Sequence, residues 1–466
     1  MDYHTAAANR QKILLDHLRP AQEPEAMQHS QLEAACCSAG DSAAYLRRSS
    51  ALDDVVVVSA LRTPVTKARR GGLKDTPADD LLAAVLKGVI SQTGINPADV
   101  GDLVVGTVLS LSGQRANECR IAMLLAGFPN TVPVRTVNRQ CSSGLQAIAD
   151  VAASIKAGYY SIGIGAGVEQ MTVDGMSWKG SVNPKISESK EAQDCMLPMG
   201  LTSENVAAQF GVSREQQDKL AARSHNRAAA AQKAGKFKAE IVPVTTTWKD
   251  PKTEEEKQLT VSADDGIREG ATAAALGKLP AVFKKGGSTT AGNSSQVSDG
   301  ASAVLLMSRA EALKRGLPIL GIFRSFSAVG VPPGIMGIGP AVAIPDAVKR
   351  AGLSLDDIDV FELNEAFASQ ATYCIEKLGL DAAKVNPNGG AIALGHPLGC
   401  TGAKLTATLL HELARRGRGA RFGVVSMCIG SGMGAAAVFE AGGEIDGPAN
   451  AAVQRQQQHL SRDANV

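Results

Sequence analysis

The sequence predicts an α/β protein made of two similar halves, with a loop-rich block inserted into it. Three observations support this prediction. Short β-branched runs alternate with stretches of helical apolar spacing from residue 54 onward. The alternation breaks at about residue 171 and returns near residue 288. A second series, which starts at about residue 319, then repeats the order of the first.

The first series opens with four valines at 55–58, the composition of a buried strand. A helix is predicted at 81–92, because apolar residues recur there at helical spacing and Gly94 and Pro97 follow. Further strands are predicted at 100–108, 132–137 and 161–168, and a further helix at 116–126. Because strands and helices alternate, we expect a mostly parallel sheet with crossover helices.

The block at 171–285 is irregular and polar, apart from predicted helices at 203–210 and 213–233. Its segment at 248–265 is charged and is predicted to be a loop. Such insertions on a rigid sheet often carry binding function.

The alternation returns with a predicted strand at 301–307 and a predicted helix at 308–315. The second series then predicts strands at 321–326, 358–363, 421–427 and 435–440, and helices at 341–351, 365–378 and 402–415. Its segment at 358–361 matches 100–104, and Asn386 before a Gly-rich turn matches Asn138 before another turn. We therefore expect a first half at 51–170 plus 286–317, an inserted loop domain at 171–285 and a second half at 318–441. Residues 1–50 form a separate arm, and 442–466 a flexible tail.

Composition narrows the classes of function. The chain has 466 residues, 44% hydrophobic and 20% charged, which is ordinary for a globular protein. A net charge of +2 gives no reason to expect nucleic acid, and no apolar run reaches membrane-spanning length. The cysteines form no C-x-x-C pair, so a zinc site or disulfide framework is not expected; they are Cys36, Cys37, Cys119, Cys141, Cys195, Cys374, Cys400 and Cys428.

Cys141 is the first candidate for chemistry, because it stands where the strand at 132–137 turns into a helix. Free backbone N–H groups and the positive end of the helix dipole gather at such a place, so the thiol is expected to shift toward the nucleophilic thiolate. The alternative is a buried structural cysteine. The small residues Ser142, Ser143 and Gly144 favour close approach of a ligand, and so the nucleophile.

Three stretches of the second half are also too unusual for ordinary core. They are N-E-A-F-A at 364–368, the Gly-rich run that contains G-H-P-L-G-C-T-G at 395–402, and C-I-G-S-G-M-G at 428–434. Together with Cys141, these motifs resemble the thiolases, and most closely the peroxisomal 3-ketoacyl-CoA thiolases of plants. The resemblance covers about 54–440 and implies the thiolase fold, with its two halves packed in α-β-α-β-α layers.

The resemblance also implies roles. Cys141 would be the nucleophile that carries the acyl group, His396 its base, and Cys428 the second acid/base. The enolate oxygen would meet His396 and a water held by Asn364, and the tetrahedral oxygen would meet the N–H groups of Cys141 and Gly430. A metal site at His396 and Cys400 would lack further ligands, so no metal is expected.

The substrates are expected to be coenzyme A and its thioesters, and no cofactor is implied. By the same resemblance Arg268 would lie beside the adenine nucleotide, with Met199 and Ser295 along the pantetheine channel. Pro198 stands where the short-chain biosynthetic members of the family have histidine. This difference argues against an enzyme that acts on acetoacetyl-CoA alone. Cys195 lies in the inserted block, and we expect that it pairs with Cys141 under oxidation.

The arm at 1–50 resembles a targeting segment. Arg10, Gln11, His17 and Leu18 match the N-terminal type 2 peroxisomal signal, which an import receptor reads and which is then removed. The expected cut lies near Cys36 and Cys37, and the last residues do not match the S-K-L signal. The expected location is the matrix of the peroxisome, or glyoxysome.

The sequence therefore predicts thiolysis of a 3-ketoacyl-CoA by CoA in fatty-acid β-oxidation, by a homodimer with ping-pong kinetics. Two alternatives stay open: an acetoacetyl-CoA thiolase that works in the condensing direction, and a non-catalytic lipid carrier on the same scaffold. Neither nucleic acid nor membrane is an expected partner.

Overall fold

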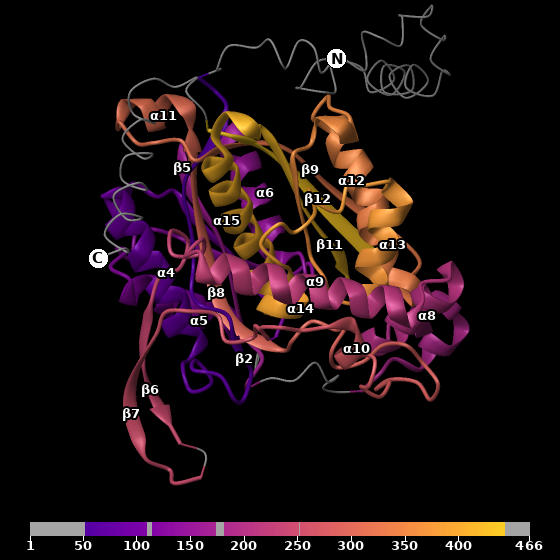
Figure 1. Cartoon of the computed structure of the whole chain (residues 1–466). Helices are drawn as coiled ribbons and strands as arrows, with labels where there is room; N and C mark the ends of the chain where they lie inside the picture. The colour runs from indigo at the N-terminus through magenta and orange to yellow at the C-terminus, as the bar shows by residue number, and fades with distance from the viewer. Residues whose placement is uncertain (1–51, 110–113, 174–180, 251, 443–466) are drawn as a thin grey trace, which may run out of the picture.

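The computed structural model describes residues 52–109, 114–173, 181–250 and 252–442 (Figure 1). The predicted targeting segment and nearly all of the predicted tail lie outside these residues. Within the described ranges, no helix has the length and apolar character needed to cross a membrane.

The strands of the two halves follow the same order. In the first half the order is β1-β8-β5-β3-β4 (Val55–Arg62, Ser298–Ser308, Ile162–Gln170, Asp102–Gly106 and Val134–Val137). In the second it is β9-β12-β11-β10 (Gly321–Gly330, Met433–Ala441, Phe422–Ile429 and Val360–Leu363), and a bridge from Phe361 to Val385 extends it where β4 extends the first. The internal repeat read from the sequence is thus a repeat of topology.

A short seam joins the two sheets. Strand β1 pairs with β9 through Val56 with Ile322 and Val57 with Gly321, which makes one continuous sheet. The short strand β2 (Thr66–Lys67) adds to β8.

The sheet is mixed, so the expectation of a mostly parallel sheet was wrong. Only the pairs β3·β4, β3·β5 and β10·β11 run parallel among the named strands. The turn at 430–432 is too short for a crossover, so β12 returns antiparallel to β11. Strand β8 follows the long insertion, which leaves its direction free, and it runs antiparallel to both β1 and β5.

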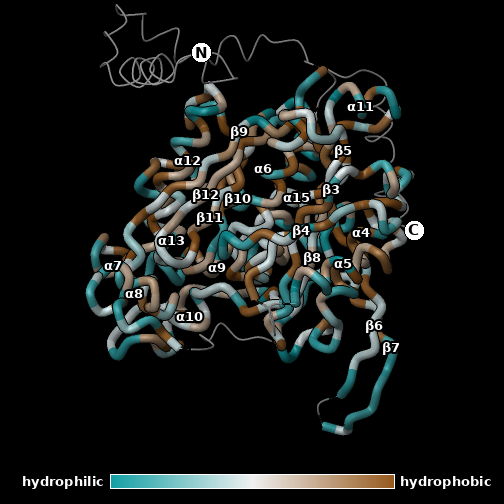
Figure 2. Tube along the Cα trace, turned by 180° about the vertical axis from the view of Figure 1, so that it is seen from behind, coloured by the Kyte–Doolittle hydropathy of each residue, from teal (hydrophilic) through white to brown (hydrophobic). Residues whose placement is uncertain are grey.

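Helices and sheets alternate in five layers. One outer layer holds α4 (Ala78–Thr93) and α5 (Arg115–Leu125), the middle layer α6 (Ser143–Lys156) and α15 (Leu398–Arg416), and the other outer layer α12 (Gly339–Arg350) and α13 (Ala368–Leu378). The middle core joins β1 and β8 of the first half to β11 and β12 of the second. Figure 2 shows apolar residues along these inner strands. The predicted layered α/β fold is confirmed.

The inserted block lies mainly on the second half. It holds α7 (Lys190–Asp194), α8 (Met199–Phe210), α9 (Arg214–Lys233) and α10 (Ala273–Leu276), and α9 contributes Leu220, Ala221 and Ala222 to the outer core beside α13. Ser213 caps α9 in a capping box with Gln216. Short 3-10 helices lie at Pro97–Asp99, Pro184–Glu188, Pro333–Ile338, Leu355–Asp357 and Gly417–Gly419; α11 (Arg309–Lys314) and α14 (Ala391–Leu394) complete the helices of the described ranges. The exact block boundaries stay a prediction.

The segment at 248–265, predicted to be a loop, instead contains strand β7 (Glu256–Val261), which forms a hairpin with β6 (Val244–Lys249). The hairpin extends away from the body (Figure 1). Because most of its side chains face solvent, it lacks the alternation of apolar and polar residues that marks a half-buried strand.

Candidate active site

Two helix ends meet at the contact between the halves. A Cβ added to Gly144, near the start of α6, would lie 2.6 Å from the carbonyl oxygen of Gly399, near the start of α15. A Cβ on Gly402 would lie 2.2 Å from the backbone nitrogen of Leu145. Only glycine permits this approach. Since Cys141 just precedes α6 and His396 just precedes α15, the contact brings the two segments together.

A tight turn presents Cys141. Gln140 adopts φ of 48°, in the left-handed region that non-glycine residues seldom occupy. Ser143 Oγ accepts from the Arg139 N–H at 2.9 Å and donates to the Gln140 carbonyl at 2.6 Å. These bonds hold the turn in a strained conformation, as is common at functional positions.

The Cys141 thiol is protonated at neutral pH in the free protein. Burial raises the pKa of this thiol to about 11, and the charge of Glu169 acts in the same direction, although the backbone N–H groups of Gly430 and of Cys141 itself oppose it. The expectation that the helix end would shift this thiol toward thiolate was therefore wrong for the resting state, because burial outweighs the N–H groups of Gly430 and Cys141. A base must remove the proton.

His396 is the candidate for that base. Its Nδ1 atom lies 2.6 Å from Thr401 Oγ1, and its Nε2 atom lies 3.4 Å from Asn364 Nδ2. Burial lowers the pKa of the imidazole to about 3, with a further contribution from the charge of Lys404. The ring is consequently neutral, and contacts on both nitrogens fix its orientation.

Asn364 stands at the end of β10, and its backbone N–H donates to the Ser426 carbonyl at 2.8 Å. The predicted helix at 365–378 begins only at Ala368, because the preceding residue Phe367 is extended. The buried Oδ1 atom of Asn364 has no hydrogen-bond partner in the described ranges. Such an atom is normally satisfied by water or ligand.

Cys428 approaches from the last part of β11 and is buried. It packs with Met336, Ala366 and Phe367, and the half-buried Met199 lies against this cluster. Burial raises the pKa of Cys428 well above that of a free thiol, and the charge of Cys141 adds to the effect. Cys141 and Cys428 are therefore close enough for the ionisation of one to disfavour that of the other.

Gly430 lies in the turn between β11 and β12, where Ile429 pairs with Met433. Its N–H donates to the thiol of Cys141, and a Cβ on it would meet Met199 Sδ at 3.5 Å. The structure thus brings Cys141, Cys428 and Gly430 together on one side, and His396 with Asn364 on the other, at the contact between the halves.

Comparison with known proteins identifies the family. The sequence profile described as "Thiolase, N-terminal domain" matches residues 55–310, and "Thiolase, C-terminal domain" matches residues 317–441. The chain belongs to the thiolase family.

Individual relatives agree with this assignment. The thiolase is 64% identical over 458 residues to "3-ketoacyl-CoA thiolase 2, peroxisomal" of Arabidopsis thaliana, covering 98% of this chain and 99% of the relative. It is 57% identical over 436 residues to "3-ketoacyl-CoA thiolase A, peroxisomal" of Rattus norvegicus, covering 94% and 98%. The dimeric peroxisomal thiolase of Saccharomyces cerevisiae superimposes with a TM-score of 0.77 at 45% identity, covering 84% of this chain and 98% of that one.

The residues of the thiolase predicted to hold CoA lie in two places. Met199 lies against the Cys428 cluster, and the N–H of Ser295 donates to the Ala366 carbonyl of that cluster at 3.0 Å. Arg268 has an exposed side chain, and its backbone N–H donates to Nδ1 of His225 at 3.2 Å. The first two thus lie beside the proposed chemistry, and Arg268 lies at the surface.

Cys195 lies at the edge of the site. It is exposed, and its Sγ atom lies 3.8 Å from the carbonyl oxygen of Ser431, the neighbour of Gly430. Cys195 and Cys141 are both free thiols in this structure.

Sequence reasoning missed two residues of this thiolase. Thr401 holds His396, and Glu169 ends the apolar strand β5 in the first half. The Glu169 carboxylate accepts from the N–H groups of Val108, Leu109 and Gly399, each at 2.9 Å, so it anchors the first turn of α15 across the halves. Burial raises the pKa of Glu169 to about 7. The sequence contained a signal for Glu169, because an acidic residue stands near the end of a buried apolar strand.

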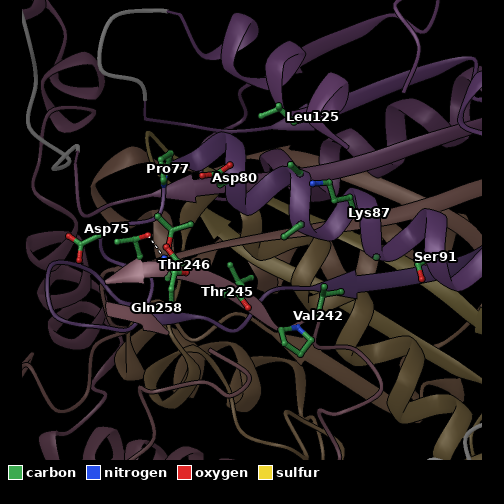
Figure 3. A pocket seen from close by; sticks show the side chains of 17 residues that line it. Asp75, Pro77, Asp80, Lys87, Ser91, Leu125, Val242, Thr245, Thr246 and Gln258 are labelled. Carbon is green, nitrogen blue, oxygen red and sulfur yellow. Dashed lines mark hydrogen bonds between the residues drawn. The ribbon is translucent and has the colours of Figure 1, made fainter. Parts of the chain in front are cut away.

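A pocket of about 740 Å³ lies elsewhere, between α4 and β6 of the thiolase (Figure 3). Its lining includes Asp80 and Lys87 of α4 with Thr245 of β6, and none of the predicted site residues. The pocket is therefore separate from the candidate active site.

Proposed function

We propose that this thiolase cleaves a 3-ketoacyl-CoA with CoA, giving acetyl-CoA and an acyl-CoA shortened by two carbons, in peroxisomal fatty-acid β-oxidation. Two observations carry the proposal: the thiols of Cys141 and Cys428 lie close to each other, and the helix starts that follow Cys141 and His396 touch at the contact between the halves. The names of the relatives from Arabidopsis and rat support the substrate class.

In the first half-reaction, Nε2 of His396 takes the proton of Cys141, and the sulfur attacks the 3-keto carbon. The N–H groups of Cys141 and Gly430 stabilise the resulting oxyanion. The bond between C2 and C3 then breaks, which leaves the acyl group on Cys141 and an acetyl-CoA enolate whose oxygen meets protonated His396 and a water on Asn364. Cys428 gives its proton to the enolate carbon, and acetyl-CoA leaves.

In the second half-reaction, the Cys428 thiolate takes the proton of an incoming CoA thiol. The CoA sulfur attacks the thioester and expels Cys141, which recovers its proton from His396. Both thiols and the imidazole return to their starting states, so no further cofactor is needed. A thiol suits the second step, since its ordinary pKa lies close to that of CoA.

Three residues are proposed to hold CoA: Arg268 beside the adenine nucleotide, with Met199 and Ser295 along the pantetheine. The contact of Met199 with the Gly430 position and the link from Ser295 to Ala366 support this arrangement, because both lie beside the reacting sulfur atoms.

We also propose a homodimer in the peroxisome matrix. The thiolase of S. cerevisiae is dimeric, and here α5 exposes Ile121, Leu124 and Leu125 beside β4, the edge strand of the first half.

The motif that includes Arg10, Gln11, His17 and Leu18 is proposed to bind an import receptor. A disulfide between Cys195 and Cys141 under oxidation stays a prediction, which thiol labelling of the oxidised protein tests.

The test is thiolysis of 3-ketoacyl-CoAs of short, medium and long chain, with mass spectrometry of the enzyme before CoA is added. We expect turnover beyond acetoacetyl-CoA and an acyl adduct on Cys141 that is absent from Cys141→Ala. Activity limited to acetoacetyl-CoA would favour the biosynthetic alternative. Binding of acyl-CoA with no adduct and no turnover would favour the lipid carrier.

A further inference from the structure

A buried carboxylate stands where the two halves meet, and the steps of the proposed reaction do not use it. Glu169 lies near the end of β5 and is fully buried. Its Oε2 atom accepts from the N–H groups of Val108 and Gly399, and its Oε1 atom accepts from the N–H of Leu109, each at 2.9 Å. Thr107 Oγ1 donates to Oε1 at 3.3 Å. Four donors therefore meet two oxygens, which suits an ionised carboxylate, because this form only accepts.

One side of Glu169 leads to the turn of Cys141. The N–H of Val108 donates to Glu169, and the carbonyl of Val108 accepts from Nδ2 of Asn138 at 3.4 Å. Oδ1 of Asn138 accepts in turn from the N–H of Gln140 at 2.9 Å, directly before Cys141. A chain of hydrogen bonds thus connects the carboxylate to the backbone of the turn that presents the thiol.

The other side of Glu169 leads to His396. Gly399 is the second residue of α15, so its N–H is one of those in the first turn that have no partner within the helix. The carboxylate supplies that partner and places negative charge at the positive end of the helix dipole. Since Thr401 of the same turn holds Nδ1 of the imidazole, a shift of this turn relative to β5 would carry the ring with it.

The backbones around Glu169 approach one another closely. A Cβ on Gly106 would lie 2.2 Å from the carbonyl carbon of Ser143, and a Cβ on Gly167 would lie 2.2 Å from the carbonyl oxygen of Gly399. The ends of β3 and β5 therefore lie directly against the first turns of α6 and α15. A carboxylate that holds both the loop after β3 and the first turn of α15 fixes how far apart these segments lie.

We propose that Glu169 is a positioning residue of the catalytic centre, which ties the turn of Cys141 to the helix of His396 and so sets the separation between the nucleophile and its base. The inference rests on the proposed thiolase reaction. A change of about 1 Å in such a separation can slow a chemical step about 100-fold. The binding of CoA, which is proposed to use other segments, should not depend on it.

The length of the side chain can be separated from its charge. The charge of Glu169 also acts on Cys141, where it opposes ionisation of the thiol. Glu169→Asp keeps the charge but is about 1.5 Å shorter, so we expect it to release Val108 or Gly399. Glu169→Gln removes the charge and keeps the length, and its amide oxygen in the place of Oε2 can accept from both N–H groups. The tether therefore predicts a faster reaction in the Gln variant, whereas a role of the charge predicts a faster reaction in the Asp variant.

The experiment measures the first half-reaction at pH 8, where the Glu169 carboxylate, with a pKa of about 7, is ionised. Rapid-quench mass spectrometry gives the rate constant at which a medium-chain 3-ketoacyl-CoA acylates Cys141, and steady-state kinetics give KM for CoA. We expect acylation to slow on the order of 100-fold in Glu169→Asp and less than about ten-fold in Glu169→Gln, with KM for CoA as in wild type. Crystal structures of both variants show the Gly399 contact and the separation of Cys141 Sγ from His396 Nε2.

Asp359→Asn is the matched control. The Asp359 carboxylate accepts from the N–H groups of Arg421 and Phe422 at 2.6 and 3.0 Å, at the ends of β10 and β11 that lie opposite to Asn364 and Cys428. This variant should lose stability and keep the wild-type rate of acylation. An equal loss of rate in Asp359→Asn would assign the effect to a general loss of stability and overturn the inference.

In each variant of Glu169 the rate should follow the contacts. Faster acylation in Glu169→Asp than in Glu169→Gln would overturn the inference. So would a variant that releases Gly399 and acylates at the wild-type rate, or one that keeps both Val108 and Gly399 and is slow, and these two outcomes decide from Glu169→Gln alone if the Asp variant does not fold. If wild type forms no acyl-enzyme, the proposed function fails, whereas the crystal structures still decide whether Glu169 sets the separation of Cys141 from His396.

Discussion

The Nδ1 atom of His396 lies 2.6 Å from Oγ1 of Thr401, in the first turn of α15. Thr401→Val keeps the shape of the side chain and removes the hydroxyl. We expect kcat/KM for thiolysis to fall about five- to thirty-fold, since a buried hydrogen bond contributes about 1 to 2 kcal/mol. Thr406→Val is the matched control, because Thr406 is buried in the same helix and donates only to the Gly402 carbonyl. Equal losses in both variants would contradict a specific role for Thr401.

The raised pKa of Cys141 predicts a slow alkylation of this thiol at neutral pH. With a pKa of about 11, only about one thiol in a thousand is ionised at pH 8, and the ionised fraction grows about ten-fold per pH unit up to that pKa. The rate of inactivation by iodoacetamide should therefore keep rising beyond pH 9. A plateau below pH 8 would show that the thiolate already dominates in the free enzyme.

The glycine contact between α6 and α15 predicts a loss of both stability and rate in Gly402→Ala. The new Cβ would lie 2.2 Å from the Leu145 nitrogen, so the helices must separate. We expect a cost of about 1 to 3 kcal/mol in unfolding free energy, and a fall in kcat on the order of 100-fold if His396 shifts by 1 Å. Gly419→Ala is the control, since nothing lies within 4 Å of its Cβ position. A normal kcat in Gly402→Ala would refute the link between this contact and the chemistry.

Arg62 predicts a large effect on stability. It is fully buried and bonds both Glu240 and Asp264, so Arg62→Met leaves two buried carboxylates without their cation. We expect the free energy of unfolding to fall by about 3 to 5 kcal/mol. Lys219→Met breaks an exposed pair with Glu215 and should change it by less than about 1 kcal/mol. Denaturant unfolding of both variants, compared with wild type, measures the difference.

Much of the fold was predictable because it rests on local patterns. The buried run at 55–58, the helix at 213–233 and the strand at 435–440 all match elements of the structure within a few residues. The direction of each strand could not be predicted in the same way, because it depends on which segments pair after the chain has turned back. The β6–β7 hairpin was missed for another reason: most of β7 is exposed and one of the buried positions of β6 is a threonine, Thr246, so the apolar period is weak.

The candidate residues could be found from the sequence, since Cys141, His396, Cys428 and Asn364 stand in unusual motifs. The structure pairs Cys141 with Cys428 and His396 with Asn364, and the helix starts that follow Cys141 and His396 touch. Their pKa values could not be predicted from the sequence. The raised pKa of Cys141 comes mainly from burial, against which the N–H of Gly430 from the second half acts, and the orientation of His396 is fixed partly by Thr401. Such terms depend on residues that meet only in three dimensions.

Because the N-terminal turns of α6 and α15 touch, each half of the chain supplies what the other lacks. A fragment that ends before β9 would retain Cys141 and lose His396, Asn364 and Cys428, and the complementary fragment would retain those three and lose Cys141. Thiolysis is then an assay for assembly: two separately expressed, individually inert fragments would report their own docking by the appearance of turnover.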